Sequence, residues 1–142
     1  MTALVDIPTV TVESVTFNLY RDIHKGIRAE LFGVTQAAGN INPEDRAARV
    51  ALAARVTNLA TLLEVHAEDE DRVLQPPTEM YLPDVADIIA RDHARFEGRV
   101  RDFSTLADDT VRAPGPEQRA RVEQLYMELA SFTSVYLSLI HI

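Results

Sequence analysis

Four long stretches of the chain carry apolar residues three or four positions apart, and this spacing limits the fold more than any other feature. Such a period places the apolar side chains along one face of an α-helix. Between the stretches lie three short segments rich in glycine, proline or asparagine, residues that end helices. We expect helices over residues 14–38, 42–73 and 83–109, and a fourth from residue 116 onward.

The four predicted helices are amphipathic, and the breaks between them are short. Such helices bury their apolar faces together, which predicts an all-α fold, an antiparallel up-down-up-down four-helix bundle. Gly39 suits a left-handed residue at the end of the first helix, and Asn42 suits the N-cap of the second. Residues 1–13 are rich in β-branched residues without a helical period, and we expect an extended N-terminal arm; a disordered tail is the alternative. Residues 14–142 would form the single bundle domain.

Composition excludes several kinds of partner and site. The net charge of −8 argues against nucleic acid or an anionic membrane, since both require a basic surface. The absence of cysteine excludes disulfides, thiolate zinc sites and iron–sulfur clusters. No apolar run approaches the roughly 20 residues of a membrane span, and residues 1–13 do not resemble a secretory signal. We therefore expect a cytoplasmic protein.

Three histidines occupy positions on the apolar stripes where core residues are expected. In the second helix the stripe continues into His66 and Glu70, and His24 and His93 lie on the stripes of the first and third helices. Three such placements would arise by chance about once in twelve, if a stripe takes about three positions in seven. A single buried histidine is more simply a hydrogen-bonded core residue, but three on successive helices favour a shared site. Glu97 adjoins the third stripe and could reach the same point.

Imidazoles and carboxylates inside a helical bundle are suitable ligands for iron, manganese or zinc. The Glu-x-x-His signature of ferritin-type di-iron proteins and the His-Glu-x-x-His signature of zinc proteases are both absent. Counting residues from the breaks places His66 and His93 at one height on adjacent helices. The same count leaves His24 about 13 Å from that height, which the first connection would have to make up.

The order His, His-x-x-x-Glu, His on successive helices resembles the hemerythrin-like (HHE) cation-binding family over residues 14–136. The matching segments are residues 20–28, 66–70 and 92–97. The resemblance implies a four-helix bundle that holds two non-haem irons bridged by carboxylates. It also implies that His24, His66 and His93 are nitrogen ligands and Glu70 is a bridging carboxylate. Glu97 would stand where some members place a second ligand of the third helix.

The fourth helix departs from the family pattern. The family closes its site there with Tyr-Leu-x-His and a later acid, whereas Leu139 follows Tyr136-Leu137-Ser138. His141 lies about 200° round the helix from the expected position. We interpret residues 137–142 as translated adapter sequence at a truncated gene end, so that this chain would carry an incomplete centre.

Three functions are compatible with these residues. The first is a non-haem iron protein that binds or senses O₂, NO or iron; with only four histidines, sensing or storage is favoured over oxygen carriage. The second is a helical regulatory or interaction module whose histidines are structural and hold no metal. The third, a metalloenzyme, is not favoured, because nothing in the sequence indicates a substrate pocket beside the metal. Tyr20 and Tyr136 could support the ligands, although core packing explains both.

Overall fold

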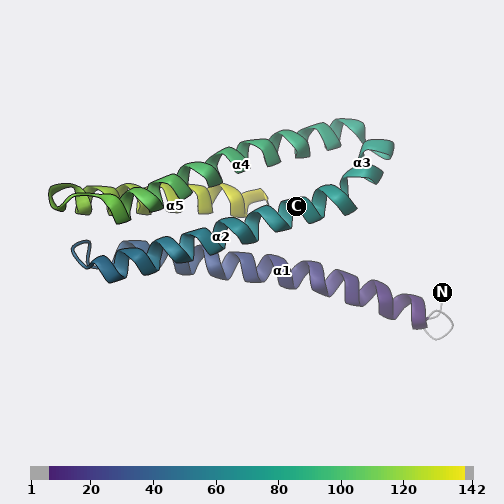
Figure 1. Cartoon of the computed structure of the whole chain (residues 1–142). Coiled ribbons are helices and arrows are strands. Elements are labelled where there is room, and N and C mark those ends of the chain that lie inside the picture. The colour runs from purple at the N-terminus through teal and green to yellow at the C-terminus, as the bar shows by residue number, and fades with distance from the viewer. Residues whose placement is uncertain (1–6, 140–142) are drawn as a thin grey trace.

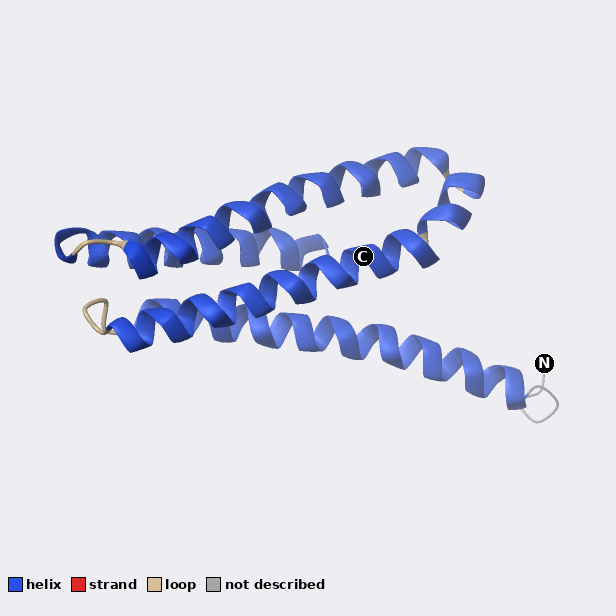
Figure 2. Cartoon of the chain, in the orientation of Figure 1, coloured by secondary structure: helices blue, strands red, loops and turns tan. Residues whose placement is uncertain are grey.

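The computed structural model describes the backbone of residues 7–139 and the side chains of residues 22–139. Helices joined by short loops make up this part of the chain, and it contains no strand (Figure 2). The all-α class expected from the sequence is therefore confirmed. The elements are α1 (Ile7–Asn40), α2 (Arg46–Val73), α3 (Gln75–Tyr81), α4 (Pro83–Arg112), the short 3₁₀ helix η1 (Gly115–Glu117) and α5 (Gln118–Leu139).

The four long helices pack in a ring in which each has two neighbours. Helices α1 and α4 both pack against α2 and α5, and each long helix runs back along the one before it (Figure 1). The stripes seen in the sequence face the middle of this ring, where most of their apolar side chains are buried, as is usual for amphipathic helices; at the start of α4 the stripe residue Val85 is exposed. The largest completely buried side chains are Ile27, Leu31, Leu59, Phe103, Leu125, Leu129 and Phe132.

The expectation of an extended arm over residues 1–13 is wrong for residues 7–13, which form the start of α1. Their β-branched residues cost at most about 0.7 kcal/mol each relative to alanine in a helix. An existing helix adds a hydrogen bond with each further residue, so such a modest penalty does not stop it. Residues 1–6 lie outside the described part of the chain.

The first connection differs from expectation at both ends. Helix α1 continues through Gly39, which has no positive φ, so it is not a left-handed cap. A Cβ at Gly39 would lie 2.9 Å from Cε1 of Tyr126, so glycine serves the close approach of α1 and α5. The N-cap of α2 is Asp45, whose carboxylate accepts from the backbone N–H of Ala48, whereas Asn42 accepts from that of Glu44 within the loop.

The second connection contains a helix of its own. Helix α2 ends at Val73, as expected, but the prolines after Gln75 lie in the first turn of α3 instead of in a loop. Proline is tolerated there because the first-turn N–H groups have no partner within the helix. Helix α3 therefore forms the link between the end of α2 and the start of α4 (Figure 1).

A buried arginine links α2, α4 and the first connection at the end of the bundle opposite α3. Arg49 is almost fully buried; its Nε donates to the carbonyl of Thr110 at 2.9 Å and its Nη1 to that of Pro43 at 2.6 Å. We expect Arg49→Met to lower the free energy of unfolding by about 2–3 kcal/mol, because both carbonyls lose a charged donor. Urea unfolding measures this. Arg46→Met is the matched control: Arg46 donates to Val111 at 3.3 Å in an exposed position, and the change should cost less than about 1 kcal/mol. Equal losses in both variants would contradict the assigned role of Arg49.

None of the helices within residues 7–139 combines the length and the apolar character needed to cross a bilayer.

Candidate metal centre

Two imidazoles and a carboxylate meet between α1 and α2. The Nε2 atoms of His24 and His66 lie 3.2 Å apart, and Nε2 of His66 lies 3.5 Å from Oε1 of Glu70. One atom from each of these residues falls within 4.8 Å of the other two. Both histidines are buried, with exposed fractions of 8% and 6%, so the stripe positions do place them in the core.

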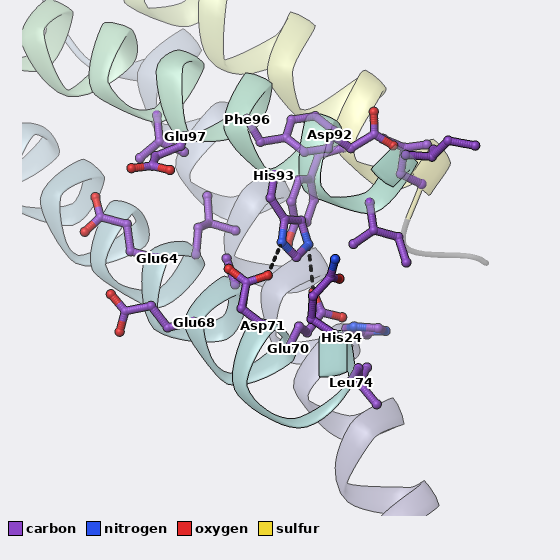
Figure 3. Close-up of a pocket in the computed structure, with 18 of the residues that line it drawn as sticks. His24, Glu64, Glu68, Glu70, Asp71, Leu74, Asp92, His93, Phe96 and Glu97 are labelled. Atoms are coloured by element: carbon purple, nitrogen blue, oxygen red, sulfur yellow. Dashed lines mark hydrogen bonds and ion pairs between the residues drawn. The ribbon is translucent and has the colours of Figure 1, made fainter. Parts of the chain in front are cut away.

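His93 of α4 joins this cluster through Glu70. Its Nε2 lies 3.5 Å from Oε1 of Glu70, and its Nδ1 lies 2.8 Å from Oδ1 of Asp71 (Figure 3). Two successive carboxylates of α2 thus contact the two nitrogens of one ring. When Nδ1–H donates to Asp71, Nε2 carries the lone pair and faces Glu70, which is the arrangement a metal-binding histidine requires.

The two ends of the cluster prefer different protonation states. Burial lowers the pKa of His24 below its usual 6.5, and the adjacent His66 lowers it further, while Glu70 acts in the opposite direction. Contact with Glu70 raises the pKa of His93, Asp71 adds to this shift, and partial burial opposes it. His24 is thus held in the neutral form that binds metals, whereas at His93 a proton competes with a metal ion.

Of the five residues predicted as ligands, the structure brings four together and leaves the fifth apart. His24, His66, Glu70 and His93 form the cluster, but the exposed carboxylate of Glu97 lies 3.5 Å from Nη1 of Arg101, one turn further along α4. Asp71, which the sequence analysis did not select, takes the place beside His93. No pattern in the sequence singles out Asp71, which follows Glu70 directly and gains its partner only through the packing of α4 against α2.

The predicted gap between His24 and His66 closes because the first connection is longer than expected. His24 lies 16 residues before the last residue of α1, and His66 lies 20 after the first residue of α2. The difference of four residues corresponds to about 6 Å, which the five-residue connection makes up. In contrast, His93 contacts Glu70 and Asp71 and so lies one turn beyond the height of His66.

The donor set fits a single first-row ion. Two ligands at adjacent corners of a tetrahedral site lie about 3.3–3.4 Å apart when each metal–ligand bond is about 2.0–2.1 Å. The separations of 3.2 and 3.5 Å around His66 agree with this value, and all three donor atoms lie within 4.8 Å of one another, so an ion could bind His24, His66 and Glu70 once these side chains close around it. Two imidazoles and a carboxylate suit iron or zinc without need of sulfur, and His93 lies next to this group through its contact with Glu70.

A large cavity lies beside the cluster, which the sequence did not predict. Its volume is about 640 Å³, and it is bordered by α2, α4 and α5, with His24 of α1 at its inner side. Glu70 and His93 line it, so the cluster can be reached from the cavity (Figure 3).

The fourth long helix contributes no ligand to the cluster within residues 118–139. Leu139, at the position where the family pattern has a histidine, lines the cavity together with Tyr136. Tyr136 packs against Phe96 and Phe132 in the core, as the simpler of its two interpretations predicts. The side chain of Tyr20 and residue His141 lie outside the described part of the chain.

Comparison with known protein families gave one match. A family model described as the hemerythrin HHE cation-binding domain matches residues 15–135, which include His24, His66, Glu70 and His93. No match was found among curated proteins or among solved structures.

Proposed function

The chain belongs to the hemerythrin HHE cation-binding family, and from this premise we propose that it is a non-haem iron protein that binds or senses a small ligand such as O₂ or NO. The observation that carries the proposal is the meeting of His24, His66 and Glu70 atoms at 3.2 and 3.5 Å in a buried position. Bound ferrous iron would supply an open coordination position for the diatomic ligand. The protein would supply the ligands, the hydrogen bond from His93 to Asp71, and an apolar surrounding, which together set affinity and redox potential.

We propose one ion for this chain and two irons for a complete centre of the family type. Glu70 lies between His66 and His93, with 3.5 Å to each, which suits a carboxylate that could bridge two ions. The second ion would require a donor from the fourth helix, where Leu139 lines the cavity without a ligand atom. The arrangement we propose for the domain, residues 14–142 of this chain, is the antiparallel up-down-up-down bundle.

A helical module with structural histidines is the second candidate, and one observation favours it. The histidines and acids of the cluster contact one another, and no buried side-chain nitrogen or oxygen within residues 22–139 lacks a hydrogen-bond partner. Such a cluster can be stable without an ion. Metal binding therefore decides between the two candidates.

We propose binding, not catalysis. The sequence indicated no substrate pocket beside the metal, but in the structure the cavity borders Glu70 and His93, so the lack of a pocket no longer speaks against an enzyme. The proposal of binding therefore depends on the family match to a cation-binding domain. The cytoplasmic location expected from the sequence stays a prediction.

Titration of the metal-free protein with ferrous iron under anaerobic conditions tests the proposal. We expect one tightly held ion per chain, and an optical change when air or NO is admitted. Two tightly held ions would show that the chain completes its centre despite Leu139. Absence of binding by iron, cobalt and zinc alike would leave the histidines with a structural role.

A further inference from the structure

The cavity beside the cluster is much larger than a diatomic ligand requires. A water molecule takes about 30 Å³ in the liquid, and O₂ or NO is of similar size, so about 640 Å³ is some twentyfold more. Pockets for drug-sized organic molecules span about 300–1,000 Å³ and have mostly apolar walls. The volume therefore indicates an organic ligand.

The walls of the cavity are apolar and partly aromatic. Phe96, Phe132 and Tyr136 lie on its inner side, contributed by α4 and α5. Val85, Ile88 and Ile89 extend the wall along α4, and the first two of these are exposed, so the entrance is accessible. Aromatic faces attract a cation that has been removed from water as well as apolar groups.

The charges around the cavity are nearly all negative. Within residues 22–139 the wall contains one arginine and no lysine. Arg101 lies 3.5 Å from a carboxylate oxygen of Glu97, and His93 is already in contact with Glu70 and Asp71. The negative potential of the wall would repel an anionic ligand, and Arg101 is already paired with Glu97. We therefore expect the cavity to disfavour anions. The six acidic residues of the wall are Glu64, Glu68, Glu70, Asp71, Asp92 and Glu97.

Two of these carboxylates have no cationic partner in the described structure. Glu70 and Asp71 contact His93, Asp92 pairs with Arg95, and Glu97 pairs with Arg101. Glu64 and Glu68 make no ion pair within residues 22–139, and they stand one turn apart on the same side of the pocket (Figure 3). Like charges at this spacing destabilise a helix by a few tenths of a kcal/mol, and a cation placed between them would relieve this repulsion.

We propose that the cavity binds an organic cation. Its apolar part lies against the partly accessible rings of Phe96 and Tyr136, behind which Phe132 is fully buried, and its positive group lies near Glu64 and Glu68. A quaternary or alkylated ammonium ion with an aromatic or branched apolar part has the matching size and charge. This binding does not require the metal ion, because neither Glu64 nor Glu68 belongs to the histidine cluster.

Benzyltrimethylammonium is a suitable probe, with phenylacetate as an anion that carries a similar ring. Both are titrated into ¹⁵N-labelled protein treated with a chelator, so the outcome is independent of iron binding. We expect the cation to shift the amide resonances of residues around the cavity and to bind at least about tenfold more tightly than the anion, as two carboxylates would require. Equal binding of the two probes, shifts confined to other regions, or no shifts at millimolar probe would overturn the proposal.

Charge-neutral variants locate the positive group. Each carboxylate about 6 Å from the cation contributes roughly threefold in affinity in water, so the double change Glu64→Gln and Glu68→Gln should weaken binding of the cation by about tenfold. The matched control is the double change Glu44→Gln and Glu123→Gln, which removes two exposed charges outside the cavity and should leave affinity unchanged. An equal loss in both doubles would show only a response to net charge, and would refute the assigned position.

Discussion

Replacing His66 by alanine is expected to weaken binding of a divalent ion by more than about 100-fold. Loss of a group that merely supports a ligand costs 10- to 100-fold, and His66 is itself placed as a ligand. Its Nε2 is the atom that contacts both His24 and Glu70, at 3.2 and 3.5 Å, so its removal separates the two remaining donors. Competition with a chromophoric chelator measures the affinity.

Thermal unfolding provides a second measure of the same change. An ion that binds only the folded protein stabilises it by about 2.7 kcal/mol when its free concentration is 100 times the dissociation constant. The midpoint temperature of unfolding of the wild-type protein should therefore rise when the ion is added. The midpoint temperature of His66→Ala should remain at the value that this variant has in the absence of metal. An unchanged response in this variant would place the ion elsewhere.

Glu97→Ala is the matched control, because the sequence pattern and the geometry of the structure predict different results for this change. The sequence pattern makes Glu97 a ligand candidate, but its carboxylate is exposed and lies 3.5 Å from Arg101. We expect at most about a twofold change in affinity, since removal of an exposed charge near an ion contributes little in water. A loss as large as that of His66→Ala would show that α4 rotates or shifts on metal binding.

The helical period correctly placed His24 and His66 in the core, because a stripe position fixes the direction of a side chain relative to the helix axis, whereas His93 on the third stripe is only partly buried. His24, His66 and Glu70 were found in this way. The period does not fix how far each helix slides along its neighbour, and this sliding depends on the lengths of the connections. For this reason the predicted gap at His24 was too wide, and His93 meets Glu70 and not His66.

Features that depend on the space between helices were not predictable from one sequence. Asp71 lies next to a stripe and would be exposed on an isolated helix, and it gains a partner only because α4 brings His93 within 2.8 Å. The cavity likewise depends on the packing of α2, α4 and α5 together. The early start of α1 was missed for a different reason, since β-branched residues resist helix formation only weakly.

Replacing Phe132 by alanine is expected to lower the free energy of unfolding by about 3–5 kcal/mol, the cost of removing a buried phenyl ring from a close-packed core. Its ring is fully buried and lies 5.1 Å from that of Phe103, 5.3 Å from that of Tyr136 and 5.7 Å from that of Phe96. These edge and stacked contacts add to the loss from burial. The total free energy of unfolding of a natural domain is only about 5–15 kcal/mol, so the variant should be close to the limit of folding.

Urea unfolding of Phe132→Ala, Phe132→Leu and Phe32→Ala separates packing at this position from the loss of any phenyl ring. Phe32 is 53% exposed on the outer face of α1, so its replacement should cost less than about 1 kcal/mol. Phe132→Leu keeps most of the apolar volume and should cost about 1.5 kcal/mol, with the loss concentrated in the ring contacts. If Phe132→Ala were no more destabilising than Phe32→Ala, the aromatic contacts between α4 and α5 could not be the core of the folded chain. The aromatic wall of the cavity, which these contacts between α4 and α5 form, would then have no structural basis.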